Sequence, residues 1–204
     1  MKKFILLLLV LLFPLCMLGQ NIQTKFFGLT IGKQYSPEEV KAALMKVSNT
    51  KKCWVSGQTI TSEAISFAGH IWSSVSFRLS EDNKLCFVDF TEKYTDNSKA
   101  LFHFIDLSDL LQSKYGEGKQ WKEYKRSYCR WVQTNGMQID LQLADLNRDD
   151  DNKQKRWETI LQRLHLLDKQ NDVILPLYWV SITYANYGLL YKVNQPNQSI
   201  IDEI

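Results

Sequence analysis

The sequence predicts an α+β protein in which two tandem helix-plus-antiparallel-sheet units form a continuous or saddle-shaped sheet with helices on one face. Three observations predict this class. Three segments carry apolar residues at helical spacing, the stretches between them alternate apolar and polar residues, and turn signals separate the alternating stretches. A helix followed by a run of strands occurs twice, and each helix should cover one face of an antiparallel sheet.

Helical spacing predicts three helices. The first begins at Ser36, which forms an S-x-x-E capping box with Glu39. The second covers about residues 98–115 and ends where Gly116 provides a stop. The third covers about residues 153–167. The residues of the second helix that we expect to face the core are Leu101, Phe104, Ile105, Leu107, Leu110 and Leu111.

The strands of the first unit follow from alternation. In one strand the side chains expected to face the core are Ile71, Val75, Phe77 and Leu79, and those expected on the other face are Trp72, Ser74, Ser76 and Arg78. A polar turn at residues 81–84 leads to a strand at 85–90. Gly69-His70 marks a turn after an earlier strand at about residues 59–68.

The second unit repeats this order. Its strands are expected at residues 121–126, 128–133, 137–143 and 177–184. Asn135-Gly136 predicts a two-residue hairpin turn between the second and third of them. The chain then divides into a first helix-plus-meander unit at 20–95, a second unit with a helical insertion at 96–194, and a loose tail at 195–204.

This order of elements, with the Gly69-x-x-Trp72 hairpin, resembles the beta-lactamase-inhibitor-protein-like fold. It is also similar to uncharacterised secreted proteins of Bacteroidota, whose leaders often end just before a glutamine. The resemblance covers most of the chain after residue 19. It implies a binding surface on the open face of the sheet, and it does not imply inhibition of a lactamase, because a fold does not fix a function.

Residues 1–19 have the pattern of an export signal. Lys2 and Lys3 precede an apolar run that is too short to span a membrane, and Gly19 supplies a small residue at the expected cleavage point. No later stretch is long enough for a transmembrane segment. We expect a secreted or periplasmic protein. Lipidation of Cys16 is the alternative, and it would attach the chain to the outer membrane.

Three cysteines follow the leader, Cys53, Cys86 and Cys129. They allow at most one internal disulfide, and spacing does not reveal which pair would form it. Cys86 shares a predicted strand face with Val88 and Phe90, which favours simple burial. No CxxC motif activates any of the three thiols.

Composition and motifs exclude several classes. Hydrophobic residues at 45% and charged residues at 23% are typical of a globular protein, and a net charge of +3 is too small to suggest nucleic acid as a partner. The sequence contains no G-x-S-x-G, H-E-x-x-H, P-loop, G-x-G-x-x-G or paired CxxC motif. We therefore expect no enzyme activity, no catalytic residues, no metal and no cofactor.

An acidic run from Asp145 to Asp151 places oxygen ligands at alternate positions, as in the first half of a calcium loop. Asp150 stands where the loop needs glycine, and Arg156 stands where a bidentate Glu is expected. A solvated acidic loop before a helix explains the same residues.

A basic stretch interleaved with aromatics covers residues 114–131. It is typical of a surface for nucleic acid or an anionic glycan, because bases and sugars stack on aromatic planes near cations. An edge strand protected by lysines explains the same pattern without a ligand.

The sheet face that points away from the helices is the candidate binding surface. Trp72, Phe87 and Trp179 are expected there among polar neighbours, and large aromatics on a polar face are typical of sites for a protein or a glycan. Arg78 and Asp140 would add polar specificity. The alternative is that the insertion or a long loop covers these residues.

We therefore expect an exported, non-enzymatic binding protein whose partner is an unknown protein or a glycan. The first alternative is an envelope-associated scaffold or assembly component lipidated at Cys16. The second is a hydrolase that uses Asp, Glu or His residues outside any recognisable motif. Its sign would be a deep cleft with two converging ionisable groups.

Overall fold

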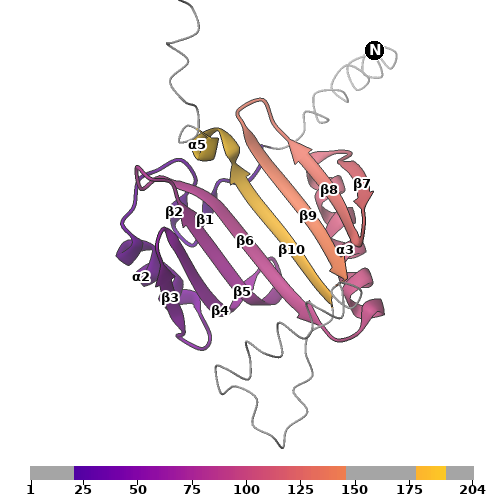
Figure 1. Cartoon of the computed structure of the whole chain (residues 1–204), viewed down its shortest axis with the longest axis horizontal. Helices are drawn as coiled ribbons and strands as arrows, with labels where there is room; N and C mark the ends of the chain where they lie inside the picture. Colours follow the sequence, from indigo (N-terminus) through magenta and orange to yellow (C-terminus); the bar gives the residue numbers. More distant parts are fainter. Residues whose placement is uncertain (1–20, 146–177, 192–204) are drawn as a thin grey trace, which may run out of the picture.

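The computed structural model describes residues 21–145 and 178–191. Its main feature is an eight-stranded antiparallel sheet in the order β3-β4-β5-β6-β10-β9-β8-β7 (Figure 1). The strands are β3 (Cys53–Ser56), β4 (Thr59–Phe67), β5 (His70–Leu79), β6 (Leu85–Tyr94), β7 (Lys119–Glu123), β8 (Arg126–Val132), β9 (Met137–Asp145) and β10 (Tyr178–Asn186). Within these residues a hairpin and three helices accompany the sheet, namely β1 (Lys25–Phe26), β2 (Leu29–Thr30), α2 (Pro37–Val47), α3 (Asn97–Tyr115) and α5 (Tyr187–Tyr191). The predicted α+β class with a large antiparallel sheet is confirmed.

Each half of the sheet is a meander. β3 to β6 follow one another from one edge, and β7 to β10 do so from the other edge. The halves meet where β6 and β10 pair antiparallel, from Tyr94 opposite Tyr178 to Phe87 opposite Ala185. α2 precedes the first meander and α3 precedes the second.

The two long helices and the β1–β2 hairpin pack on one face of the sheet. α2 contacts β3 and β4, whereas α3 contacts β6, β9 and β10 and lies behind the sheet in Figure 1. Phe26 of the hairpin lies with its ring 5.9 Å from Phe90 and 4.8 Å from Tyr184. The buried apolar residues of helices, hairpin and strands form one core cluster on this side.

Local sequence explains where the helices begin and end. The Ser36 side chain accepts from the Glu39 N–H at 3.2 Å, and the Glu39 carboxylate accepts from the Ser36 N–H at 2.7 Å, so the predicted capping box is confirmed. At the start of α3 the Asp96 carboxylate accepts from the Ser98 N–H at 2.7 Å. α3 ends at Gly116, whose φ of 84° is unfavourable for a residue with a side chain.

The inner face of α3 differs from the predicted one. Leu107 and Leu111 are buried as expected, but Leu101, Ile105 and Leu110 are 43%, 42% and 50% exposed, so their predicted place in the core is wrong. The residues of α3 that are buried instead are Ala100, His103 and Ser108. The predicted set spans more than half of the circumference of a helix, and only part of such a set can face a sheet.

A switch of faces within β4 and β5 overturns the predicted position of Trp72. Trp72 is only 1% exposed and lies on the helix side, whereas Ile71, predicted to be inside, is 64% exposed. Regular pairing is interrupted between Glu63–Ser74 and Ile65–Trp72, next to Ala64 with its φ of 51°. Beyond this point the side chains of both strands change faces, because alternation holds only while the pleat is unbroken.

The other strands are where alternation predicted them, within a few residues. β3 and the β1–β2 hairpin were not specifically predicted, because each is short and lacks a clear alternating pattern. The loop between β8 and β9 has three residues, since Gln133 closes on Met137 with an N–O distance of 2.9 Å. The predicted two-residue turn is therefore wrong by one residue, although Gly136 has the positive φ, 80°, that such loops require.

Several predictions lie outside the described residues. These are the export signal at 1–19 with Cys16, the helix at about 153–167, most of the acidic run that begins at Asp145, and the tail at 195–204. Cys53, Cys86 and Cys129 are all free thiols. Within the described part of the chain, no helix has the length and apolar character needed to cross a bilayer.

Candidate functional site

The sheet face opposite α2 and α3 is lined by polar side chains in rows that cross the strands. In one row each residue is the Cα partner of the next, in the order Thr61, Ser76, Asp89, Thr183, Asp140, Arg130 and Lys119. In the next row the order is Glu63, Ser74, Thr91, Ser181, Gln142, Tyr128 and Trp121. We refer to the surface made by these two rows and their neighbours on the same side as the polar face.

Asp89 lies at the centre of the polar face. Its carboxylate accepts from the hydroxyl of Thr183 at 2.6 Å and from the hydroxyl of Thr91 at 2.8 Å. Burial raises the pKa of Asp89 above its ordinary value, and these two hydrogen bonds oppose the rise. A desolvated carboxylate on a sheet face costs stability, and such groups are enriched at functional sites.

Asp140 lies two strands away and is held by four donor atoms. Arg130 donates through Nε at 2.5 Å and through Nη2 at 3.2 Å, the Gln138 amide donates at 2.7 Å, and the Tyr187 hydroxyl donates at 3.0 Å. The paired geometry with Arg130 is the strong form of an Arg–carboxylate contact. Asp140 therefore fixes Arg130 on the polar face and connects α5 to it.

An aromatic stack lies beside this ion pair at the β7 edge. The rings of Trp121 and Tyr128 are 4.8 Å apart and within 9° of parallel. The Arg130 guanidinium lies 5.0 Å from the centre of the Trp121 ring. The chain of contacts from Asp140 through Arg130 to Trp121 and Tyr128 thus spans three strands, β9, β8 and β7.

The structure brings four of the five predicted binding residues to the polar face. Arg78 is exposed and is the Cα partner of the partly exposed Phe87. Trp179 is partly exposed and lies at the other end of β10, about 20 Å along the strands from Phe87. Asp140 lies between these two ends. Trp72 is not part of this surface, because its indole is buried under α3.

Trp72 instead belongs to a buried cluster on the helix side. Its ring lies 5.4 Å from that of His103, and the His70 ring lies 4.6 Å from His103. The Tyr94 hydroxyl is hydrogen-bonded to His103 Nδ1, and His103 Nε2 is buried with no partner among the described residues. Burial, with the nearby His70, lowers the pKa of His103 to about 4.

A cavity of about 290 Å³ lies at the C-terminal end of α3. Tyr115, Trp131 and Arg130 are among its lining residues. Trp131 closes one side, since its Nε1 donates to the Gly116 carbonyl at 2.8 Å. The cavity is at the small end of the range for ligand sites, and neither Asp89 nor Phe87 lines it.

Sequence reasoning placed Asp89 on the polar face, but it missed the desolvation of this carboxylate and the pairing of Arg130 with Asp140. The two-residue turn expected at Asn135-Gly136 would have placed Arg130 opposite Leu141, on the wrong face. The three-residue loop shifts the register by one and brings Arg130 opposite Asp140. The place of Asp89 on the polar face followed from alternation, because it stands among apolar residues in β6.

The polar face presents hydroxyl, carboxylate, amide and guanidinium groups together with aromatic rings. Within the described residues, no cluster of three or more His, Cys, Asp or Glu side chains is arranged to hold a metal ion. The groups present can hydrogen-bond and stack against a ligand. In comparisons with protein-family models, with curated proteins and with solved structures, none matches this chain.

Proposed function

We propose that this chain is an exported, non-enzymatic binding protein that recognises its partner with the polar face. The observation that carries the proposal is that Arg78, Phe87, Asp140 and Trp179 share one sheet face. The described helices α2 and α3 pack on the opposite face. Aromatic side chains within a polar, partly exposed surface are typical of recognition sites.

We also propose that the chain consists of two related units, each a helix followed by four strands. The order of strands supports this, since each half of the sheet runs inward from its edge and the halves meet at their last strands. Under this proposal β6 corresponds to β10 and α2 corresponds to α3. The polar face then extends across both units, which favours an elongated partner over a small molecule.

The charge pattern favours binding over hydrolysis. Asp89 and Asp140 lie on the same row, separated by β10 and hence by about 10 Å between their Cα atoms. Asp140 is already occupied by Arg130, Gln138 and Tyr187, so it is a poor general base or nucleophile. A pair of free, converging carboxylates would support the hydrolase alternative.

Truncation of the aromatic residues tests the proposal. Phe87→Ala and Trp179→Ala should each leave the circular dichroism spectrum unchanged and abolish capture of the partner from glycan arrays or secreted-protein fractions. Phe102→Ala is the matched control, because Phe102 is 68% exposed on α3, away from the polar face. Partner binding that survives both polar-face substitutions, or that is lost in the control, would contradict the proposal.

Mass spectrometry of the mature N-terminus tests the export route. Cleavage after Gly19 would leave an unmodified chain that starts at Gln20. A diacylglyceryl group on Cys16 would instead support the envelope-associated scaffold.

A further inference from the structure

The half of the polar face made by β7 and β8 carries a concentration of positive charge. Residues 119–132 contain five cations and one carboxylate, Glu123. Three of the cations lie on the polar-face side of their strands, Lys119, Arg126 and Arg130. Lys119 and Arg126 are exposed, and neither forms an ion pair with another described residue.

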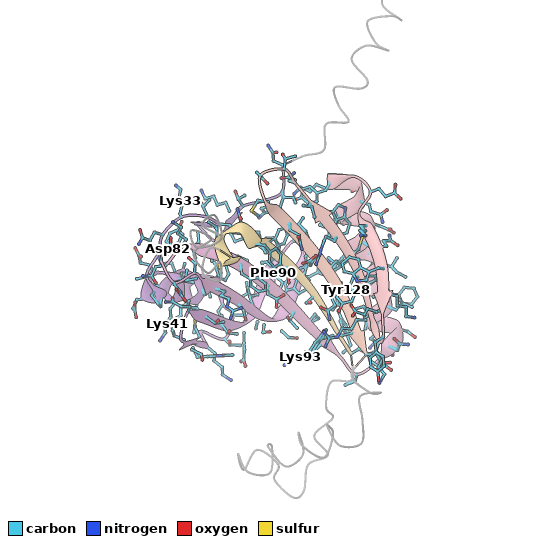
Figure 2. All side chains as sticks on the ribbon, turned by 45° about the horizontal axis from the view of Figure 1, so that its top comes forward. Lys33, Lys41, Asp82, Phe90, Lys93 and Tyr128 are labelled. Atoms are coloured by element: carbon cyan, nitrogen blue, oxygen red, sulfur yellow. The ribbon has the colours of Figure 1, made fainter. Side chains whose placement is uncertain are left out.

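These cations flank the Trp121–Tyr128 stack on both sides. Lys119 and Arg130 are Cα partners on one side of the stacked pair, and Arg126 is two residues from Tyr128 on the other side. Trp179 and Lys93 continue the surface toward β6, since Arg126, Ala144, Trp179 and Lys93 are successive Cα partners. Figure 2 labels Tyr128 and Lys93 on this half of the molecule.

Edge protection does not explain this arrangement. Lysines on an exposed edge strand hinder pairing with other chains, which accounts for Lys119 and Lys122 on β7. Arg126 and Arg130 are on β8, which is paired on both sides, and Lys93 is on β6 near the middle of the sheet. Cations at these interior positions protect no edge. The pair with Asp140 accounts for Arg130, whereas Arg126 and Lys93 need another explanation.

We propose that this half of the polar face binds an acidic polysaccharide. The inference rests on the proposed function, because it takes the polar face as the binding surface, and it names the ligand class. Sugar rings would stack against Tyr128 and Trp179, and their carboxylate or sulfate groups would pair with Lys119 and Arg126.

Neighbouring polar side chains can form hydrogen bonds with the hydroxyl groups of such a polysaccharide. Thr91, Ser181 and Gln142 are successive Cα partners in the row of Tyr128, and they offer hydroxyl and amide groups to sugar hydroxyls. The Tyr128 stack and the Arg130–Asp140 pair hold the aromatic rings in place before binding. Less side-chain entropy is lost on binding as a result.

The experiment measures the affinity of the full exported chain for polygalacturonate and for chondroitin sulfate, at low and high salt. Dextran is the neutral comparison, and duplex DNA tests for a general polyanion site. We expect binding to both acidic polymers that weakens with salt, with little binding to dextran or DNA.

The charge-reversal variant Lys119→Glu/Arg126→Glu should weaken binding of the acidic polymers by roughly tenfold or more. The matched control is Lys33→Glu/Lys41→Glu, which makes the same change in net charge on the opposite side of the molecule in Figure 2. It should leave affinity within about twofold of the parent, because distant surface charges are screened. Tyr128→Ala should weaken binding by roughly threefold to tenfold, through loss of a stacking contact.

Three outcomes would overturn the inference: no binding of either acidic polymer, equal binding of DNA, or an equal effect of the two charge-reversal variants. If neither acidic polymer is bound but the Phe87→Ala and Trp179→Ala variants still lose another partner, this inference fails and the proposed function stands. If those variants retain every partner while the acidic polymers are also not bound, both proposals fail.

Discussion

Asp89 shows how a single residue can lower the stability of the sheet that contains it. It is desolvated in the middle of the sheet, and within the described residues its carboxylate accepts hydrogen bonds from the hydroxyls of Thr91 and Thr183. Neutral hydroxyl donors do not compensate a buried charge as an ion pair would. The raised pKa of Asp89 expresses this cost.

Asp89→Asn should therefore be neutral or stabilising at neutral pH. Because the pKa is higher in the folded state, the folded protein binds its proton more tightly, and the Asp89 contribution to stability falls as pH rises above the ordinary carboxyl value. The variant should lack this part of the pH dependence. Urea denaturation between mildly acidic and neutral pH measures the free energy of unfolding of both proteins. A variant that is less stable at neutral pH, with the same slope of stability against pH as the parent, would contradict the prediction.

Burial shifts the pKa of His103 downward, so its effect on stability as a function of pH is opposite to that of Asp89. Its pKa falls from 6.5 to about 4 in the folded protein, so the unfolded chain binds the proton more tightly between these values. The charged groups nearest to it are His70, whose effect lowers the pKa, and Asp106, whose effect raises it. Tyr94 packs against the same ring and its own pKa is raised to about 12, so it stays neutral in this range.

The protein should lose stability as pH falls from about 6.5 toward 4, by up to about 3 kcal/mol from this histidine. His103→Asn removes the titration and keeps a polar atom near the Tyr94 hydroxyl. Chemical denaturation over this pH range should show a shallower loss for the variant. An unchanged slope would mean that another group carries the acid sensitivity.

At the scale of elements, the face switch in β4 and β5 decides what the aromatic residues do. Because the pleat is interrupted next to Ala64, Ile65 and Trp72 lie inside and Ile71 lies outside. The Trp72 indole donates to the Phe67 carbonyl at 3.2 Å and packs against Phe90, which fixes it in the core.

Trp72→Ala should consequently destabilise the fold by about 3–5 kcal/mol, since it removes a large side chain from a packed core. Trp179→Ala should cost less than about 1 kcal/mol, because its side chain is partly exposed on the polar face. Guanidinium denaturation of the two variants side by side gives the comparison. Similar losses for both would show that Trp179 is also structural.

The capping box of α2 offers a test of a local sequence rule. Ser36→Ala removes the acceptor for the Glu39 N–H and should cost about 1 kcal/mol. Glu38→Ala is a suitable control, since Glu38 is exposed in the same turn and is not part of the box. Thermal unfolding followed by far-ultraviolet circular dichroism reports both. A loss in the control as large as that in Ser36→Ala would contradict a specific cap.

Periodicity predicted most of the elements because regular strands and helices repeat their environment at a fixed spacing. It failed where the repeat is interrupted, as at Ala64, and where a loop differs by one residue from expectation, as after Val132. Four of five candidate residues were therefore placed on the correct face, and Trp72 was not. The Arg130–Asp140 pair could not be predicted, because it depends on an exact register that the turn sequence alone did not determine.

At the scale of the whole molecule, the sheet has a stable centre and two weaker edges. β5, β6, β10 and β9 are paired on both sides and carry most of the buried core, whereas β3 and β7 are short edge strands. Local opening is easiest where backbone hydrogen bonds are solvent-exposed and few side chains are buried.

Amide hydrogen exchange should rank these strands accordingly. Protection should be greatest in β6 and β10 and least in β3 and β7, because the central amides exchange only when the pairing between the two meanders opens. Mass spectrometry of peptic fragments measures this ranking. Edge strands that are as protected as β6 would imply that something covers them.

The position of β10 also governs how the chain can be assembled during synthesis. The last strand that the structure describes is inserted between β6 and β9, and its partners in β6 lie more than 80 positions earlier in the sequence. Until β10 is in place, β6 and β9 each have one edge whose backbone groups are unpaired. Either edge can pair with a strand from a neighbouring molecule. A chain truncated before β10 would thus expose both edges and should be prone to aggregation.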